Sequence, residues 1–591
     1  MIGASERFRR VFEIAFFCLL FAVVFYFRLP SFSDAMCDPD QGEVGYAAKL
    51  LLAGHCPYGE AILTKPPSSL VIYAALFALF GPHMLAVHLF AALWAFVTCV
   101  MLYVLGKRHL NTFTGVTAAG LYAFYQAEIL SGGLCANYEY WSVLPALVSL
   151  HLARNDNVEG REWRMFGVGV AAGLSAMAKQ TAVVFFAAAL AFIVVIWWRS
   201  NRLRGFSTLV SSLALAVVGF VSAIAVFFPI FVAVNCVEAT AHELNPLVLK
   251  NYLGAITRQQ QWGFFTIQMS RLWRSVACLA CLVFVSLGAV LATYKTRKNL
   301  SLFGGALLYA LAGAASIFSG GRFYGHYFTV IFPFLCLVVA VGFGSVTRKW
   351  PRKWRWALLA PLLLCGAADS YGELRLAHLS ADSLRRTGSV MSQEIFSDNR
   401  HGGIEYYTAN QMINQLEWDA SYRQIGEMVK AQLQPGEAIW CYDYTPEIYY
   451  HADAWAPTKH NENFDVVTSC SDPWFGSWHG TLDQTVLNHR ERLMRELSAR
   501  PPTFIFRYKM PCPGGVYDFR RPQKIWPLNA NGQPMAFCPC KMETFPELQY
   551  FLDVLYDILP PETNGAIEIY RLREGGADNP FFEESRSATR K

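Results

Sequence analysis

The sequence predicts a polytopic α-helical membrane protein that is followed by a soluble α/β domain. Of the 591 residues, 54% are hydrophobic and only 16% are charged, and the apolar residues gather in long runs over the first part of the chain. A helix of about 20 apolar residues crosses the hydrocarbon core of a bilayer, so such runs indicate membrane spans. From about residue 371 the long apolar runs stop, and Asp, Glu, Asn, Tyr and Pro become frequent. We therefore expect a membrane domain at 1–370 and a soluble domain at 371–591.

About eleven spans are expected. The first apolar run is too long for a cleavable signal sequence and ends without a small-residue cleavage site, so it predicts an uncleaved first helix. Leu70–Gly81 is short for a span and is expected to lie at the outer face. Lys179–Gln180 should break the run 165–198, because an unbroken helix would bury a lysine near mid-membrane at a cost of several kcal/mol. The expected spans are 11–29, 83–105, 112–130, 138–153, 165–178, 181–198, 207–234, 272–294, 300–319, 327–346 and 355–370.

The basic loops predict the orientation. With the N-terminus in the cytoplasm, every loop on that side is basic, as the positive-inside rule requires. These loops are Gly106–His109, Arg154–Arg164, Arg199–Arg204, Lys295–Lys298 and Thr347–Arg355. They also account for the formal charge of +6, so we expect no nucleic-acid partner. The first loop, 30–68, and the C-terminal domain then lie outside a membrane that we expect to be the bacterial plasma membrane.

The C-terminal region repeats a helix-then-strand pattern, which predicts an α/β domain. The pairs are 420–433 with 438–442, 485–499 with 503–507, and 545–558 with 566–570. On the outer side its cysteines are expected to be able to form disulfides. They are Cys441, Cys470, Cys512, Cys538 and Cys540. No Cys/His spacing typical of a zinc site accompanies them.

The first outer loop carries the strongest functional signal. Asp38, Asp40 and Glu43 follow the first span, and Lys65 precedes two prolines before the next apolar stretch. A carboxylate can deprotonate an acceptor hydroxyl, and a fixed cation can bind a phosphate. Two plainer interpretations stay open. Asp40 and Glu43 have the spacing of a helix capping box, and Lys65 is also typical of a lysine that anchors a span at the membrane boundary.

Other outer loops add polar residues at the starts of spans. Asn137 and Glu139 precede one span, although an acid at a helix start also has a purely structural explanation. Lys179, Arg322 and His326 are cations on the side where the positive-inside rule predicts few. We interpret this surplus as the binding site of an anion.

At these residues the chain resembles the C-superfamily of membrane glycosyltransferases, in the group that is similar to protein O-mannosyltransferases and the lipid A aminoarabinose transferase. The resemblance implies a multi-span fold, a polyprenyl-phosphate-linked sugar donor, and transfer at the outer leaflet. By position, Asp40 would be the general base or a metal ligand, and Lys65 would hold the donor phosphate. Many relatives have Asp-Glu where this chain has Asp40-Gln41, so Asp38, Asp40 and Glu43 all remain candidates for the base. The matching segments are Asp38-x-Asp40-x-Gly42-x-x-x-Tyr46, Gly54-x-x-Pro57-Tyr58, Lys65-Pro-Pro67, Asn137-x-Glu139, Lys179-Gln180, and Gly321-Arg322 through His326-Tyr327.

We therefore expect an inverting glycosyltransferase. Its catalytic candidates are Asp40, Asp38 and Glu43, and its donor-phosphate ligands are Lys65, Arg322, His326 and Lys179. Its substrate-binding residues are Tyr46, Tyr58, Asn137 and Tyr327, and Asp40 with Glu139 would hold an optional Mg²⁺ or Mn²⁺. No P-loop or strand-linked GxGxxG motif is present, so no nucleotide cofactor is expected. The acceptor would be a glycolipid, a glycan or a protein.

Three other functions compete with this one. The first is a flippase or transporter of lipid-linked saccharides, against which the chain shows no internal repeat and places most of its notable charges at one face. The second is a polysaccharide polymerase, which would use an oligosaccharide donor. In the third, the C-terminal region would serve as a receptor or scaffold.

Overall fold

The structure of the chain is a computed structural model. The structure describes residues 2–61, 63, 65–128, 133–154, 161–200, 206–244, 258–292, 299–319, 321, 323–387, 419, 422–442, 446–460, 469–472, 476–479, 484–508, 524–525, 540–541, 545–559 and 567–575. It divides into two compact units that do not follow chain order. Unit 1 comprises Met1–Asp38, Lys65–Ile230 and Phe265–Leu416, and unit 2 comprises Pro39–Thr64, Phe231–Phe264 and Glu417–Lys591.

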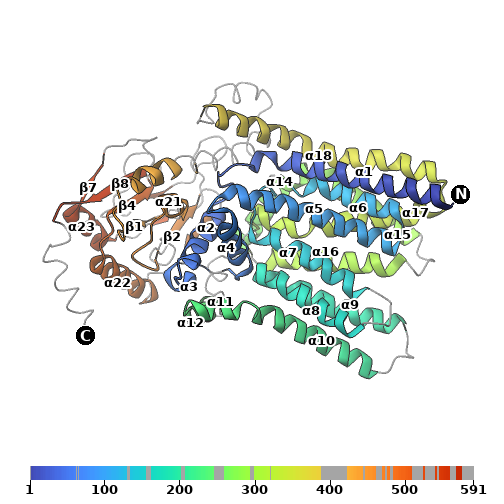
Figure 1. Ribbon diagram of the computed structural model, residues 1–591, viewed down its shortest axis with the longest axis horizontal. Helices are drawn as coiled ribbons and strands as arrows, with labels where there is room; N and C mark the ends of the chain where they lie inside the picture. Colours follow the sequence, from blue (N-terminus) through green and yellow to red (C-terminus); the bar gives the residue numbers. More distant parts are fainter. Residues whose placement is uncertain are drawn as a thin grey trace. The chain divides into compact units, whose positions relative to one another are not determined.

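Unit 1 is a helical bundle whose long helices run side by side in Figure 1. The helices that belong wholly to it are α1 (Ile2–Arg28), α4 (Ser68–Phe80), α5 (Met84–His109), α6 (Thr112–Tyr125), α7 (Tyr138–Ala153), α8 (Arg161–Ala178), α9 (Val183–Ser200), α10 (Phe206–Ala225), α15 (Ala277–Ala292), α16 (Asn299–Ser319), α17 (Phe332–Val346) and α18 (Arg352–Thr387). Short 3-10 turns η1 (Leu29–Ser31), η2 (Gln180–Ala182), η3 (Gly325–Val330) and η4 (Thr347–Lys349) connect some of them. α11 (Phe228–Ala233) and α14 (Arg258–Ser275) each contain a unit boundary.

Six helical segments in the described part of the chain are long and apolar enough to cross a membrane. They are Arg10–Ser31, Met84–His109, Gln180–Trp198, Phe206–Ala233, Ser301–Ser319 and Gly325–Lys349. The expected count of about eleven is therefore not confirmed. Several other expected spans form shorter helices: α6 has 14 residues, and α7 has 16 and contains both Glu139 and Pro145. α4 has 13 residues, in line with the short helix expected there, and its place at the outer face remains a prediction.

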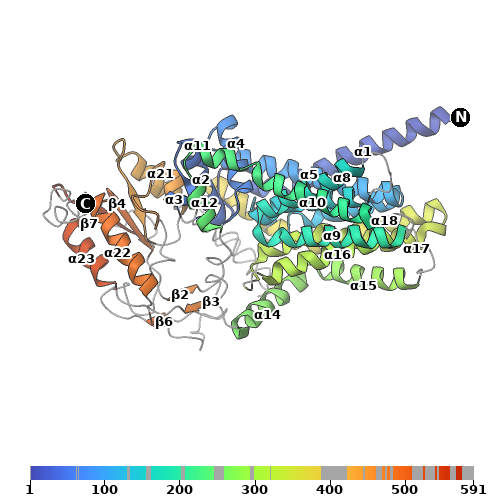
Figure 2. The same cartoon turned by 90° about the horizontal axis from the view of Figure 1, so that it is seen from below.

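The predicted helix break at Lys179 is confirmed. α8 ends at Ala178, Lys179 has an extended backbone, and η2 begins at Gln180. α8 then lies beside α10 (Figure 2). Gly169 of α8 and Gly219 of α10 allow this approach, because a Cβ atom at either position would collide with backbone of the other helix. Small residues let helices pack closely where apolar burial alone does not favour contact.

Unit 2 is built around a mixed four-stranded sheet with the order β1-β4-β8-β7. The strands are β1 (Ile439–Cys441), β4 (Phe504–Tyr508), β8 (Ile567–Leu572) and β7 (Tyr556–Ile558). β1 and β4 are parallel, with Trp440 opposite Ile505, and the other two pairs are antiparallel. Two small ribbons pair β2 (Ser469–Asp472) with β3 (Gly476–His479), and β5 (Lys524–Ile525) with β6 (Cys540–Lys541). The expected α/β character of the C-terminal region is thus present in the described strands and helices.

Helices cover both faces of this sheet, because alternate residues of each strand point to opposite sides. Trp440 and Ile505 pack on one face against α22 (Gln484–Ala499) and α23 (Pro546–Leu555). Ile439 and Phe504 pack on the other face against residues 422–430 and α21 (Pro446–Ala452). The same face also receives Tyr46, Leu50 and Ala61 from the first loop, which contains α2 (Pro39–Leu52) and α3 (Pro57–Glu60). The first loop therefore forms part of the core of unit 2.

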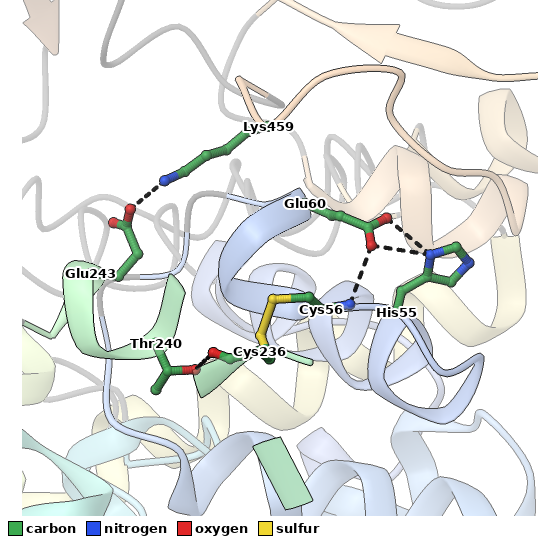
Figure 3. The surroundings of a disulfide bond; sticks show 7 residues. All are labelled: His55, Cys56, Glu60, Cys236, Thr240, Glu243 and Lys459. Carbon is green, nitrogen blue, oxygen red and sulfur yellow. Dashed lines mark hydrogen bonds and ion pairs between the residues drawn. A yellow bond between two sulfur atoms is a disulfide. The ribbon is translucent and has the colours of Figure 1, made fainter. Parts of the chain in front are cut away.

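A disulfide inside unit 2 joins two distant segments (Figure 3). Cys56, directly before α3, is bonded to Cys236, directly before α12 (Val237–Glu243), 180 residues away in the sequence. Glu243 at the end of α12 forms an ion pair with Lys459. This bond does not use the cysteines singled out in the sequence. Cys441 is a buried thiol in β1, and Cys512 and Cys538 lie outside the described residues.

The predicted boundary near residue 371 lies inside α18. A separate domain at 371–591 remains a prediction. In the structure, Tyr46, Leu50 and Ala61 of the first loop pack with the C-terminal sheet.

Candidate active site

The loop before α7 is held by a buried arginine. Arg28, the last residue of α1, is 0% exposed. Its guanidinium donates to the carbonyl oxygens of Gly133 and Leu134, at 2.7 and 3.0 Å, and to the Tyr140 hydroxyl at 3.0 Å. Buried polar groups are expensive unless they are hydrogen-bonded, so these contacts give the loop a defined position. Arg28 was not singled out from the sequence, although an arginine at the end of the expected first span 11–29, on the side expected to be outer, is an exception to the positive-inside rule.

Further contacts hold the same loop and tie it to the first outer segment. The Tyr73 hydroxyl of α4 and the Trp141 indole both donate to the carbonyl oxygen of Ala136, at 3.1 and 2.9 Å. The Cys135 thiol donates to the carbonyl oxygen of Cys37 at 3.3 Å. The residues that follow Ala136 and Cys37 in the chain are Asn137 and Asp38. Two segments with candidate site residues are thus fixed next to each other within unit 1.

A buried ion pair lies at the start of α7. Lys179, from the break between α8 and η2, pairs with Glu139 Oε1, and their side chains are only 7% and 2% exposed. The Lys179 ammonium also lies 3.7 Å from the centre of the Tyr327 ring. A lysine in such a place is stabilised only if its charge is compensated. Glu139 and the ring of Tyr327 supply that compensation.

His326 lies between two carboxylates. Its Nδ1 is 4.0 Å from Asp38 Oδ2, and its Nε2 is 3.8 Å from Glu139 Oε1. Phe323, three residues before His326, is a non-glycine residue with a φ of 51°. Such a backbone conformation costs on the order of 1–3 kcal/mol and is frequent at functional sites. Asp38, Glu139, Lys179, His326 and the residues bonded to them therefore form one cluster, which we call the α7 cluster.

Lys65 reaches the same part of the bundle. Its ammonium lies 5.5 Å from the centre of the Tyr138 ring, and Tyr138 is the residue before Glu139. This places the predicted phosphate-binding lysine beside the α7 cluster. Arg322, which was also predicted to bind phosphate, lies outside the described residues.

The start of α7 contains buried polar atoms that make no hydrogen bond. Asn137 is 3% exposed, and neither atom of its carboxamide has a partner among the described residues. The Oε2 atom of Glu139 is likewise buried and has no hydrogen-bond partner among the described residues. Asn137 occupies the cap position of α7, yet its side chain does not cap the helix. Each unpaired buried polar group costs about 1–3 kcal/mol, so three of them within three residues call for a binding partner.

The remaining predicted residues belong to unit 2. Asp40 lies in the first turn of α2, and Glu43 is buried at 8% exposure. Tyr58 is fully buried, and burial, reinforced by the charge of Glu43, raises its pKa well above the usual value. Tyr46 stacks on Tyr449, with ring centres 4.9 Å apart, and its hydroxyl accepts a hydrogen bond from the backbone N–H of Ala456. The catalytic role of Asp40 and Glu43 and the substrate-binding role of Tyr46 and Tyr58 remain predictions.

The sequence predicts that Asp40 and Glu139 hold an optional Mg²⁺ or Mn²⁺. The part of the chain that the structure describes contains no group of three or more His, Cys, Asp or Glu side chains placed to hold a metal ion. The Oε1 atom of Glu139 already faces the Lys179 ammonium, where a divalent cation would meet a like charge. The described α7 cluster therefore does not fit a metal.

Comparison with known proteins supports the resemblance drawn from the motifs. Residues 64–225 match the model of the family described as dolichyl-phosphate-mannose-protein mannosyltransferase. This segment is less than half of the chain, and it contains Lys65, Asn137, Glu139 and Lys179. No curated protein matches the chain.

Solved structures with a similar fold include two of ArnT from Cupriavidus metallidurans. The structure bound to undecaprenyl phosphate has 13% identity and a TM-score of 0.51, covering 95% of this chain and 98% of ArnT. The apo structure has 15% identity and a TM-score of 0.50, covering 84% and 93%. The archaeal oligosaccharyltransferase AglB from Archaeoglobus fulgidus, solved with an inhibitory peptide and a dolichol-phosphate, has 10% identity and a TM-score of 0.47, covering 85% and 70%. With its apolar helices, the protein is an integral membrane protein that resembles the C-superfamily of membrane glycosyltransferases.

Proposed function

We propose that this protein is an inverting glycosyltransferase that moves a sugar from a polyprenyl-phosphate donor to an acceptor hydroxyl at the outer face of the membrane. The observation that carries the proposal is the α7 cluster, where Lys179 and His326 meet the carboxylates of Asp38 and Glu139 in a bundle with the fold of ArnT. The ArnT structure was solved with undecaprenyl phosphate, which supports a lipid-linked donor here. The matching mannosyltransferase family supports the same class of donor.

The proposed reaction is a single displacement at the anomeric carbon. The acceptor oxygen forms a bond to that carbon while the bond from the carbon to the phosphate oxygen breaks. The electron pair leaves with polyprenyl phosphate, and the acceptor proton passes to a carboxylate of the protein. One displacement inverts the anomeric configuration. The protein must therefore supply a base and positive charge near the leaving phosphate.

Asp40, Asp38 and Glu43 are the candidates for the base. Asp38 lies in the α7 cluster, 4.0 Å from His326. The imidazole of His326 is proposed to help to position this carboxylate. Asp40 remains the base that the family motif favours, so the two must be separated by experiment.

Lys65, Lys179 and His326 are proposed to contact the donor phosphate, with Arg322 as the fourth cation predicted from the sequence. Of the three described residues, Lys179 is paired with Glu139. Lys179 would therefore act on the donor phosphate together with Glu139, as a fixed dipole and not as a free charge. Preorganised dipoles of this kind need no rearrangement as charge develops on the leaving group.

Asn137 and Glu139 are proposed to bind sugar hydroxyls. The Asn137 carboxamide offers both donors and an acceptor, and Glu139 Oε2 offers an acceptor, all without a partner among the described residues. Hydroxyls both donate and accept, whereas a phosphate only accepts and would be repelled by Glu139. Tyr327, which faces Lys179, would add an aromatic surface for the sugar ring, and Tyr46 and Tyr58 are further predicted contacts.

The outer location of the first loop remains part of the proposal. The Cys56–Cys236 disulfide supports it, because disulfides persist in oxidising compartments such as the periplasm and are rare in the cytosol.

The test compares Asp38→Asn, Asp40→Asn and Glu43→Gln as the sole copy of the protein in its own host. Lipid-linked sugars and glycan products from the membranes are measured by mass spectrometry. The variant that removes the base should accumulate a monosaccharide-linked polyprenyl phosphate, and one product should lack one sugar. Loss of the base typically lowers turnover by about 10²–10⁴-fold.

Asp34→Asn is the matched control. Asp34 lies in the same loop, but its Oδ1 accepts a hydrogen bond from the backbone N–H of Leu85 at 3.0 Å, which Asn can also do. Unchanged products in all three test variants at normal protein levels would contradict the transferase mechanism. A lipid-linked oligosaccharide trapped on the inner leaflet would favour a flippase instead.

A further inference from the structure

A cavity of about 200 Å³ lies in unit 1, away from the α7 cluster. Its lining includes Phe12 of α1, whereas Arg28, which holds the α7 loop, is 16 residues further along the same helix. At 1.5 Å per residue the two positions are about 24 Å apart along the helix axis. The cavity is thus a separate feature that the proposed transfer reaction does not use.

The cavity combines cations with an aromatic wall. Arg352 and Arg355 from the first turn of α18 line it, together with Asn111, directly before α6. Its apolar wall consists of Phe12, Phe113 and Trp356. The Trp356 ring packs edge-on against Phe12 and Phe113, with ring centres 5.3 and 6.2 Å apart, so the wall is a continuous cluster from three helices.

The two arginines have unused hydrogen-bonding capacity. In the described part of the chain, the guanidinium groups of Arg352 and Arg355 form no ion pair or hydrogen bond, and the Nε atom of Arg355 is buried. The nearby acid on α1, Glu13, is paired with Lys107 at 2.6 Å. Two guanidinium groups therefore line a cavity without a described anion to neutralise them. A guanidinium matches the geometry of a phosphate through two parallel hydrogen bonds.

The cavity lies where candidate membrane spans end. The span Arg10–Ser31 begins two residues before Phe12, Met84–His109 ends two residues before Asn111, and Gly325–Lys349 ends three residues before Arg352. Ends of spans lie at the level of the lipid headgroups, where tryptophan and arginine are both frequent. Basic pockets between membrane helices at this level bind anionic headgroups.

We propose that this cavity binds the phosphate headgroup of an anionic phospholipid. Arg352 and Arg355 hold the phosphate, and the wall of Phe12, Phe113 and Trp356 packs against the apolar part of the same lipid. The aromatic wall favours a lipid over free phosphate, because inorganic phosphate has no apolar part for it to contact. This site is independent of the proposed transferase activity.

The experiment is native mass spectrometry of the purified full-length protein with phosphatidylglycerol and with phosphatidylcholine as probes. The wild type should bind phosphatidylglycerol preferentially, and Arg352→Gln with Arg355→Gln should lower that preference by about tenfold. Lys353→Gln is the matched control, because Lys353 lies between the two arginines but does not line the cavity. Its preference should stay at the wild-type value. Arg352→Gln alone serves as a second test if the double variant does not fold.

Three outcomes would overturn the proposal. Equal loss of preference in Lys353→Gln would mean that general surface charge attracts the lipid. Wild-type preference in the folded arginine variants would exclude the cavity. Full displacement of the lipid by millimolar inorganic phosphate or glycerol phosphate would identify a site for soluble phosphate.

Discussion

The buried pair of Lys179 and Glu139 can be tested by a double-mutant cycle. Glu139→Gln removes the charge that compensates Lys179, whose side chain is 7% exposed. Breaking a buried ion pair from one side costs about 3–5 kcal/mol, because the other charge stays buried. The contact of Lys179 with the Tyr327 ring, at 3.7 Å, offsets about 1–2 kcal/mol of that loss. We therefore expect Glu139→Gln to destabilise unit 1 by about 1–4 kcal/mol.

Lys179→Met should have a comparable effect, since it leaves Glu139 buried at 2% exposure beside His326. The double variant Glu139→Gln/Lys179→Met should recover most of the stability, because replacing both members of a buried pair with neutral side chains of similar size is often neutral. Thermal unfolding of the full-length protein in detergent measures all four corners of the cycle. Additive losses in the double variant would refute the pairing.

The same variants separate folding from function. If the double variant unfolds at nearly the wild-type temperature and has no transferase activity, the pair contributes to substrate binding or catalysis. Wild-type activity in that variant would leave the pair with a structural role and would remove Lys179 from the proposed phosphate ligands.

Two further predictions concern unit 2. Replacing Cys56 and Cys236 with Ser should lower the stability of unit 2 by about 2–5 kcal/mol. The measurement is the unfolding of the full-length protein with and without reductant. Identical unfolding curves for the wild type and the variant under oxidising conditions would contradict the disulfide. Burial alone would raise the pKa of Asp453, but hydrogen bonds and charges from Lys49 and Lys430 outweigh it and hold this pKa below its ordinary value. A lowered folded-state pKa adds stability above the unfolded pKa of about 3.9 and loses it as the pH falls through the folded value, so acid should destabilise the wild type more than Asp453→Asn. Because Asp453 is 46% exposed, the difference should not exceed about 1 kcal/mol, and identical acid unfolding of both proteins would argue against the interaction.

Much of the bundle was predictable from local sequence. Long apolar runs form helices because hydrocarbon leaves the backbone no external hydrogen-bond partner. The break at Lys179 was predicted from the cost of burying a lysine in an unbroken helix. The structure has the break at that residue, although Lys179 is itself buried and paired with Glu139. The helix-then-strand pattern likewise predicted a strand at 438–442, and β1 (Ile439–Cys441) lies there, buried on both faces. These are properties of a segment and its immediate surroundings.

That the residues in and beside the α7 cluster would lie close together was also predicted, in outline, from the loops in which they lie. Asp38, Lys65, Glu139, Lys179 and His326 were all selected because they follow or precede spans on the side expected to be outer. Ends of spans on one side share one level of the membrane, so such residues can meet. The sequence could not tell which of them would pair, because that depends on the order in which the helices pack.

Only the tertiary structure decided these partners. Glu139 meets Lys179 across 40 residues, and Cys56 meets Cys236 across 180. Tyr46, which was predicted to bind substrate, packs together with Leu50 in the core of the C-terminal sheet, and its substrate-binding role stays a prediction. The hydrophobic effect is not directional. An apolar residue in the sequence therefore indicates that its side chain will be buried, but not against which part of the protein. Hydrogen-bonded partners and disulfides are directional, and their geometry exists only once the chain has folded.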